Sequence, residues 1–333
     1  MTKMSDVAEL AGVSTATVSR VLRSPEEVKE ATQKKVYDAI RKLDYQPNML
    51  ARNLRINKTG TLLVVAPDLN NLVFSEMIAG IDEEAGKCGY QVLLGNANGD
   101  SKKTEGYIDQ LKQKQVDGLI LLSVQLDEKV WQDIADHYPV VIASDYVEGI
   151  QVPTISIDNV ACGKQITNHF IQMGHSNIGF IGGTLRASVS RDRLNGYKLA
   201  LTEAGVTIQD SFIEEGDYSI QSGYDLCMKM MNQPNAPTAL FCGSDEMAFG
   251  AIQALRENGY RVPEDVAVAG FDDIKFSAVM NPALTTIAQP LQKMGKKAME
   301  VLYQLINGHM SSQQQYVIES EFKIRESCGY HQK

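Results

Sequence analysis

Two hydrophobic periodicities divide this chain. Up to about residue 47, apolar residues recur every three or four positions, which is the spacing of amphipathic helices. From residue 61 onward, short runs of consecutive apolar residues alternate with longer helical patterns. Runs that are apolar throughout and are joined by helices predict parallel strands covered on both faces. The pattern therefore predicts a small all-α unit followed by a large α/β core.

The alternation of strands and helices runs through the core twice. In the first round, strands are expected at 61–67, 90–95, 118–123 and 140–144, with helices at 74–86, 103–113 and 128–137. In the second round, strands are expected at 154–158, 178–183, 212–213, 239–242 and 266–271, with helices at 160–173, 191–204, 219–232 and 245–258. We therefore predict that residues 61–333 form two similar doubly wound parallel-sheet lobes, about 61–159 and 160–289. A tail with a helix at 290–307 and a strand at 316–323 is expected to tie the lobes together, with part of 290–323 in the first lobe and the C-terminal end in the second.

Residues 6–22 predict two short helices around one tight turn. The apolar residues on one face of each helix are Val7, Leu10 and Ala11, then Val18, Val21 and Leu22. Gly12 can adopt the left-handed backbone that closes the first helix, and Ser14 can cap the second. A third helix is expected at 31–43, with an apolar stripe of Val36, Ala39, Ile40 and Leu43. Pro47 ends this unit, because a residue before proline is pushed out of the helical conformation.

Two helices around such a turn are typical of a helix-turn-helix domain, here 1–47, whose second helix enters the major groove of DNA. The outward residues of that helix would be Thr15, Ala16, Ser19 and Arg20. Arginine can form a fork onto guanine, a hydroxyl can contact bases or phosphates, and a methyl group can touch thymine. An ordinary helical hairpin on the surface is the alternative that the local pattern leaves open.

Charge is distributed unevenly along the chain. The net charge is −9, yet residues 1–58 carry 11 Lys and Arg against 7 Asp and Glu, which is +4, and the remainder carries −13. A basic head on an acidic body favours a DNA-binding module attached to a body that avoids DNA. The five cysteines form no CxxC pair and the five histidines no metal-spaced cluster, so we expect free thiols, no metal and no cofactor. With no export segment or membrane span in the pattern, we expect a cytoplasmic protein.

The linker 48–58 begins with Asn48, a good helix cap, and is only about two turns long. Isolated helices of that length are marginal in water, so we predict a hinge segment that is helical on DNA and disordered or frayed away from it. Its basic residues could neutralise phosphates, and Leu50 and Leu54 could pair with a symmetry mate or enter a base step. A simple tether whose leucines dock on the body is the alternative.

The carboxyl ends of parallel strands are where doubly wound lobes bind ligands. The residues that follow the predicted strands are 68–74, 123–125, 144–145, 183–193, 243–245 and 271–273. Phe74 and Tyr218 offer flat faces for a ring, and hydroxyl partners are offered by Asp145, Arg193, Ser244 and Asp272. This mix predicts a polar, ring-bearing small molecule. Phe74 could equally be core, and Asp145, Asp245 and Asp272 could merely cap helices.

Enzyme motifs are missing from the sequence. Gly182-Gly183 lacks the GxGxxG spacing of a dinucleotide site, and neither a GxxxxGK[ST] phosphate loop nor a GxSxG elbow is present. Asp272 and Asp273 are adjacent, so their side chains diverge at a strand end. One ligand acceptor and one cap or salt-bridge partner is a better interpretation than an acid–base pair.

Several motifs occur in an order that resembles one known family. They are Asp6-Val7-Ala8, Ala11-Gly12-Val13-Ser14, Thr17-Val18-Ser19-Arg20-Val21, Tyr45-Gln46-Pro47-Asn48, Arg193-Leu194-Asn195-Gly196-Tyr197, Asp245-Glu246-Met247-Ala248 and Gly270-Phe271-Asp272-Asp273. Across nearly its whole length the chain resembles the LacI/GalR family of bacterial transcription regulators. The resemblance implies a homodimeric repressor, with a tetramer as a further alternative, that binds a pseudo-palindromic DNA operator and has a periplasmic-binding-protein-like core.

The resemblance also assigns roles to residues. The DNA contacts are expected from Thr15, Ala16, Thr17, Ser19, Arg20, Asn48, Ala51, Leu54 and Arg55, with Leu54 as the minor-groove wedge. The effector contacts are expected from Phe74, Asp145, Arg193, Tyr218, Ser244, Asp272 and Gln289. Asp145 is included because it directly follows a predicted strand, and the other six by family position. Lys29 departs from the family, since relatives usually have a Ser or Thr cap there.

The effector class is argued from a second departure. Ser244-Asp245 stands where many sugar-responsive relatives have Asn-Asp, and the surrounding motifs look most like the cytidine-responsive branch of the family. The expected effector is therefore a nucleoside, with a sugar or sugar phosphate as the alternative. A cytoplasmic ligand-binding protein or an enzyme of sugar or nucleoside metabolism is the remaining alternative.

Overall fold

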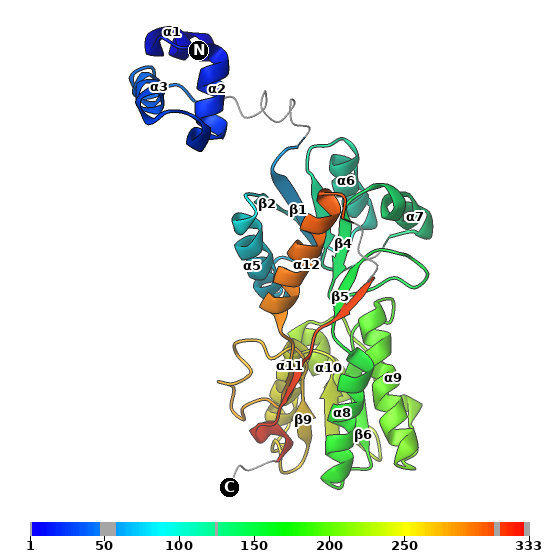
Figure 1. The fold of residues 1–333 in the computed structure, drawn as a ribbon. Helices are drawn as coiled ribbons and strands as arrows, with labels where there is room; N and C mark the ends of the chain where they lie inside the picture. The colour runs from blue at the N-terminus through cyan, green and yellow to red at the C-terminus, as the bar shows by residue number, and fades with distance from the viewer. Residues whose placement is uncertain (1, 47–57, 124–125, 310–313, 330–333) are drawn as a thin grey trace. The chain divides into compact units, whose positions relative to one another are not determined.

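The computed structural model describes residues 2–46, 58–123, 126–309 and 314–329 (Figure 1). The chain divides into two units, Met1–Thr59 and Gly60–Lys333. The predicted strands and helices of the described residues are present, with ends that differ by at most three residues, except for the tail strand predicted at 316–323. The predicted fold class, an all-α helix-turn-helix domain plus a two-lobed α/β core, is confirmed.

The first unit is a bundle of three helices, α1 (Met4–Ala11), α2 (Thr15–Arg23) and α3 (Glu30–Lys42). Gly12 has φ 65°, and its N–H closes α1 by donating to Glu9 O at 3.2 Å. Ser14 Oγ caps α2 by accepting from Thr17 N at 3.1 Å. The core of the unit consists of Val7, Ala8, Ala11, Val18, Val21, Val36, Ala39 and Tyr45. Both predicted turn residues therefore have their expected roles.

Leu10 does not share the buried face of α1 as predicted, because its side chain is 49% exposed. Successive residues in a helix are 100° apart, and Val7, Ala8 and Ala11 centre the buried face away from Leu10. At the start of α3, Lys29 gives no side-chain cap. Instead Gln33 Nε2 donates to Pro25 O at 2.7 Å and to Val28 O at 2.8 Å, which steadies the turn before the helix.

The N-lobe of the second unit contains a six-stranded parallel sheet of order β11-β5-β4-β3-β1-β2. Its strands are β1 (Thr61–Ala66), β2 (Gln91–Asn96), β3 (Gly118–Leu121), β4 (Val140–Ala143), β5 (Thr154–Ser156) and β11 (Gln315–Val317). Its helices are α5 (Leu72–Lys87), α6 (Ser101–Lys112), α7 (Glu128–His137) and α12 (Leu291–Ile306). Leu62 and Val64 pack with Met77 of α5, whereas the alternate residues Leu63 and Val65 pack with the α6 and α7 side. Both faces of the sheet are therefore buried at its central strands β1, β3 and β4.

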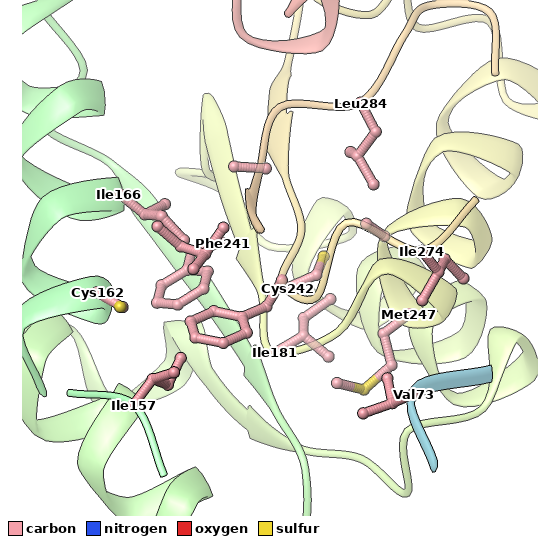
Figure 2. Packing of buried hydrophobic residues seen from close by; sticks show 14 of the residues in the cluster. Val73, Ile157, Cys162, Ile166, Ile181, Phe241, Cys242, Met247, Ile274 and Leu284 are labelled. Atoms are coloured by element: carbon pink, nitrogen blue, oxygen red, sulfur yellow. The ribbon is translucent and has the colours of Figure 1, made fainter. Parts of the chain in front are cut away.

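The C-lobe contains a four-stranded parallel sheet of order β7-β6-β8-β9. Its strands are β6 (Ile178–Gly182), β7 (Ile213–Glu215), β8 (Ala239–Cys242) and β9 (Ala267–Ala269). Its helices are α8 (Asn159–Gln172), α9 (Ser188–Glu203), α10 (Ile220–Met231) and α11 (Asp245–Glu257). Figure 2 shows side chains of α8, β6, β8 and α11 gathered in its core, among them Ile166, Ile181, Phe241 and Met247.

The structure of the C-terminal tail differs from the prediction. The expected single strand at 316–323 is two strands, β11 and β12 (Glu321–Lys323), which belong to different sheets. β11 runs parallel to β5 in the N-lobe, whereas β12 pairs antiparallel with β10 (Thr286–Ala288), a strand that the sequence analysis did not predict. The chain therefore crosses between lobes three times, at 157–158, 289–290 and 318–320.

Paired glycines let three couples of helices approach closely. A Cβ on Gly196 of α9 would lie 2.1 Å from Val160 O of α8, and a Cβ on Gly163 of α8 would lie 2.5 Å from Arg193 O of α9. The same reciprocal arrangement joins α5 to α12 through Gly80 and Gly295, and α10 to α11 through Gly223 and Gly250. Each pair brings helix backbones into direct contact, which leaves no space for a side chain at the crossing.

Candidate functional site

A cavity of about 350 Å³ lies between the two lobes of the second unit. Its lining includes residues that follow β1, β3 and β4 in the N-lobe and residues of the C-lobe loops and helices. The seven predicted effector residues all line it, namely Phe74, Asp145, Arg193, Tyr218, Ser244, Asp272 and Gln289. The structure thus brings these residues to one place, while their contact with an effector stays a prediction.

Arg193 of α9 is buried and held in a fixed direction. Its Nε donates to Asn159 Oδ1 at 2.9 Å, and its Nη1 donates to Gly243 O at 2.5 Å. The guanidinium carbon lies 3.6 Å from the centre of the Phe271 ring, and Nη1 lies 4.0 Å from Asp272 Oδ1. Three elements therefore orient this cation before any ligand arrives, which is the preorganisation that specific binding needs.

Asp272 presents a carboxylate from the loop that follows β9. Gln289 Nε2 donates to its Oδ1 at 2.7 Å. Burial raises the pKa of Asp272 above the usual range, and the Arg193 guanidinium partly offsets that rise. A carboxyl that is desolvated in this way gains by accepting hydrogen bonds from a ligand.

Asp145 links the two lobes beside the cavity. Its carboxylate accepts from Tyr146 N at 2.9 Å and from the hydroxyl of Ser188, the first residue of α9. Tyr146 Oη donates to Asp192 Oδ1 of α9 at 3.1 Å. We call these contacts of Asp145 and Tyr146 with α9 the inter-lobe contacts. Asp145 does not cap a helix of its own chain segment, which was the alternative at this position.

The two predicted aromatic residues come from opposite lobes. Phe74 lies in the first turn of α5 and is half-buried, so it lines the cavity while it also packs against the core. Tyr218 precedes α10, and its hydroxyl is hydrogen-bonded to Ser190. A Cβ on Gly183 would lie 1.9 Å from Tyr218 Cζ, so this glycine leaves room for the ring. Gly183 is therefore explained by Tyr218, whereas a Cβ on Gly182 would lie 2.6 Å from Phe180 Cε1.

Backbone strain is concentrated at the cavity. Three residues that line it have left-handed φ values, Ser144 at 73°, Tyr218 at 69° and Asp272 at 118°. Such conformations are costly for residues other than glycine and persist where the surroundings over-determine them, as they do at binding sites. Three of the seven non-glycine residues with left-handed φ in the described ranges therefore line this cavity, and a fourth, Asp273, follows Asp272.

Asp245 and Asp273, which the sequence analysis singled out beside the site, have structural roles. Asp245 is buried and accepts from Ile274 N at 2.9 Å and from Ser277 Oγ and Thr286 Oγ1 at 2.6 Å each. Ser244 caps α11, so Asp245 is an anchor for the loop after β9 and not a cap. Asp273 forms an ion pair with Arg325 at 2.6 Å, which is the salt-bridge role that the sequence analysis favoured.

Sequence reasoning missed three polar residues of the cavity, Asp217, Ser219 and Glu246. Glu246 is one position beyond the strand-end segment 243–245, and Asp217 and Ser219 flank the predicted Tyr218. A slightly wider window at the strand ends would have found them.

In the helix-turn-helix unit, Thr15, Ala16 and Arg20 are exposed on α2, and Ser19 is half-buried. Thr17 Oγ1 lies 2.9 Å from Ser14 Oγ, so its hydroxyl belongs to the cap of α2. The candidate residues Asn48, Ala51, Leu54 and Arg55 lie outside the described residues, as does the predicted hinge 48–58 except for Lys58. The DNA contacts of all these residues stay predictions.

Two further features were sought in the described residues: a metal site and a helix that could span a membrane. Within the described ranges, no three His, Cys, Asp or Glu side chains are grouped so that they could hold a metal ion. Among the helices of the same ranges, none combines the length and apolar character that crossing a bilayer needs.

Comparisons with known proteins agree with both units. Residues 3–48 match the family described as "Bacterial regulatory proteins, lacI family", and residues 59–326 match "Periplasmic binding proteins and sugar binding domain of LacI family". The chain belongs to the LacI family of bacterial transcription regulators.

Individual relatives of this LacI-family regulator cover almost its whole length. The HTH-type transcriptional repressor CytR of Escherichia coli (strain K12) is 36% identical over 326 residues, which are 97% of this chain and 95% of that one. The structure of the lac repressor dimer bound to operator and the anti-inducer ONPF matches with a TM-score of 0.89 at 29% identity, covering 98% of this chain and 99% of that one. The transcriptional regulator CelR–cellobiose complex matches with a TM-score of 0.76 at 30% identity, covering 98% and 100%.

Proposed function

We propose that this LacI-family regulator is a cytoplasmic homodimeric repressor whose affinity for a pseudo-palindromic operator is set by a nucleoside bound between its lobes. The observation that carries the proposal is the inter-lobe cavity. The seven residues predicted to contact the effector line this cavity together. Three elements orient its arginine, and three of its residues have left-handed φ values.

Operator binding is proposed for the exposed face of α2. Thr15, Ala16 and Arg20 are exposed there on a helix that Ser14 caps. The lac repressor structure that this chain resembles is bound to operator as a dimer. We propose the same use of α2 here, with the hinge 48–58 and its wedge Leu54 following it.

Replacing Arg20 by alanine tests this interface. Loss of a fork onto guanine is expected to weaken operator binding by about 1–3 kcal/mol and to relax specificity at one base pair. Operator affinity is measured by fluorescence anisotropy. The DNA is the fragment that the parent protein selects from a pool of upstream sequences. Arg261→Ala, which removes an exposed arginine of the core, is the charge-matched control. An Arg20→Ala protein with unchanged affinity and selectivity would remove α2 from the interface.

Dimerisation is proposed through the edge of the N-lobe sheet. β2 is the last strand of that sheet and carries Leu93 and Leu94, which are 48% and 49% exposed. Exposed apolar side chains on an unpaired edge strand are an aggregation hazard unless another subunit covers them. The double variant Leu93→Asp/Leu94→Asp is expected to sediment as a monomer and to lose operator affinity. A dimer that persists would exclude this surface.

The nucleoside is proposed because the cavity combines aromatic residues from both lobes with hydroxyl partners, and because the motifs resemble the cytidine-responsive branch. A sugar is the second candidate, favoured by the match to the CelR–cellobiose complex. A thermal-shift screen of nucleosides and sugars on the full chain, followed by calorimetry, separates the two.

Asp272→Ala tests the site itself. Removal of the buried acceptor is expected to abolish ligand binding in calorimetry while operator binding is retained. Unchanged ligand affinity would remove Asp272 from the site. If neither nucleosides nor sugars bind the parent protein, the proposed effector class falls.

The coupling between the sites is proposed to act through lobe closure. A ligand that changes closure alters the spacing of the two hinge segments of a dimer and so their folding on DNA. Coupling of this kind is typically about 1–3 kcal/mol, or about 5–150-fold in affinity.

A further inference from the structure

The charged residues that line the inter-lobe cavity are almost all acidic. Among the described residues of the lining, five carry carboxylates and one carries a cation. The carboxylates are Asp68, Asp145, Asp217, Glu246 and Asp272, and the cation is Arg193. An imbalance of this size sets the sign of the potential that an entering ligand meets.

The single cation is already committed to protein groups. Arg193 donates to Asn159 and to Gly243 O, it stacks on Phe271, and it lies 4.0 Å from the Asp272 carboxylate. Bidentate binding of a phosphate would need two parallel N–H groups of a guanidinium free of a competing carboxylate. The arginine is therefore a poor receptor for an anion.

Helix N-termini are the other usual receptors of phosphate, since their free N–H groups and dipole attract anions. Here a carboxylate of the protein lies near the start of each helix that begins at the cavity, and the side chains of Asn71, Ser219 and Ser244 cap α5, α10 and α11. Asp68 accepts from Asn70 N at 2.9 Å just before α5, and Asp145 accepts from Ser188 at the start of α9. Asp217 accepts from Ser219 N at 2.9 Å just before α10. The first turn of α11 carries its own acids, Asp245 and Glu246.

Two of these carboxylates come from opposite lobes and line the same cavity. Asp68 follows β1 in the N-lobe, and Glu246 lies on α11 in the C-lobe. Burial, and next the charge of Asp68, raise the pKa of Glu246. Their mutual repulsion is relieved by a hydrogen-bond donor or a positive group placed between them, and it is increased by a further anion.

We infer that the cavity accepts neutral or cationic, donor-rich ligands and rejects phosphorylated ones, because carboxylates lie near its helix N-termini and its arginine already contacts protein groups. The inference rests on the proposed function, since it concerns the same cavity, and it narrows the effector to an unphosphorylated molecule. Of the two alternatives that the sequence left beside a nucleoside, it keeps the sugar and excludes the sugar phosphate.

Matched pairs of compounds test the inference on the full chain. Calorimetry compares cytidine with cytidine 5′-monophosphate, adenosine with adenosine 5′-monophosphate, ribose with ribose 5-phosphate, and glucose with glucose 6-phosphate. A phosphate adds about −1.5 to −2 charges at pH 7. The phosphorylated member of each binding pair is expected to bind at least about a hundredfold more weakly. A 5′-O-sulfamoyl nucleoside, which is similar in size to the monophosphate and uncharged, separates charge from bulk.

Neutral variants of the acidic lining provide a second readout. For each pair, we take the ratio of the dissociation constant of the phosphorylated compound to that of the unphosphorylated one. In the double variant Asp68→Asn/Glu246→Gln, this ratio is expected to shrink by about tenfold. Glu105→Gln, which neutralises an exposed carboxylate on α6 away from the cavity, should leave the ratio at the parental value. A merely steric exclusion of phosphate would leave the ratio equal in all three proteins and would overturn the inference.

The outcomes distinguish this inference from the proposed function. If a phosphorylated compound binds as tightly as its partner, the charge selection is wrong while a ligand-responsive cavity stands. If no compound of either kind binds a protein that still binds operator, the proposed effector class falls and the inference falls with it. Selective binding of unphosphorylated compounds, with a ratio that the double variant reduces, supports both.

Discussion

At the scale of single residues, two buried acids of the C-lobe differ in their surroundings. Asp245 is fully buried and receives hydrogen bonds from Ile274, Ser277 and Thr286, whereas Asp272 lines the cavity and is bonded by Gln289. Burial raises the pKa of both carboxyls. The number of internal donors therefore distinguishes the anchor Asp245 from Asp272, whose carboxylate lines the cavity.

Asp245→Ala is expected to destabilise the core by about 2–4 kcal/mol, because it leaves three buried donors without an acceptor. Asp245→Asn keeps one acceptor oxygen and should cost less. The measurement is the calorimetric melting temperature, with Asp82→Ala on an exposed site of α5 as the control. Equal melting temperatures for parent and Asp245→Ala would show that the anchor is dispensable.

His169 and His175 are expected to make the C-lobe sensitive to acid. Burial lowers the pKa of both histidines below the usual 6.5. Below about pH 6.5 the unfolded chain therefore binds more protons than the folded one, so the free energy of unfolding falls as the pH falls through that range.

The double variant His169→Gln/His175→Gln isolates this effect. Its melting temperature is expected to fall less than that of the parent between pH 7 and pH 5, in scanning calorimetry. The raised pKa values of Asp245 and Asp272 act in the opposite direction in both proteins and cancel in the comparison. Parallel curves for parent and variant would contradict the assignment.

At the scale of elements, the helix couples α8–α9, α10–α11 and α5–α12 share one design. Each packs at reciprocal glycines, such as Gly163 and Gly196, whose added Cβ atoms would collide with backbone of the other helix. Helices that lie this close exclude water from the crossing and fix the distance between the loops at their ends. The first turn of α9 carries contacts of the cavity, so this packing helps to place the site.

Gly196→Ala is expected to destabilise the protein by about 1–3 kcal/mol, since backbone and not a flexible side chain must move. Gly106→Ala on α6 is the matched control, because its added Cβ meets nothing within 4 Å. That control should be neutral or stabilising by about 0.4–1 kcal/mol. Chemical denaturation of both variants measures the difference, and two equal changes would refute the close-packing argument.

At the scale of the whole core, two lobes with separate sheets are joined by three crossings and by the inter-lobe contacts of Asp145 and Tyr146 with α9. A two-lobed core of this kind can change its closure without unfolding either lobe. The inter-lobe contacts lie beside the cavity, where a ligand can strengthen or weaken them.

Tyr146→Phe removes the hydrogen bond to Asp192 while the ring is kept. The ratio of operator affinities with and without the ligand found by the thermal-shift screen is expected to change by about 2–10-fold, the equivalent of one hydrogen bond. Fluorescence anisotropy on operator DNA measures it, with Tyr224→Phe on the outer side of α10 as the control. A ratio that matches the parent would place the coupling elsewhere.

Much of this architecture could be predicted locally. The order of strands and helices follows from hydrophobic periodicity, which depends on neighbours a few positions away. Gly12 ends α1 and Ser14 caps α2 through their own backbone conformation and side chain, so their roles are local as well. Most residues of the cavity could be predicted because parallel strands place their carboxyl ends on one edge, whereas Gln289 came from the family resemblance and Asp217, Ser219 and Glu246 were missed. The spacing places Leu10 on one face with Val7 and Ala11, yet it is 49% exposed, because how much of that face is covered depends on where α2 and α3 lie.

The amino-acid sequence by itself determined the order of elements, the charge asymmetry, the family and the residues that the two sheets deliver to the cleft, because each depends on local pattern or strand direction. Only the tertiary structure decided that the tail strand divides between two sheets, that glycines meet at helix crossings, that Asp245 is an anchor, and that carboxylates from both lobes line one cavity. These features join residues far apart in the chain, and the energies that select them arise from packing and desolvation, which exist only once the lobes are folded.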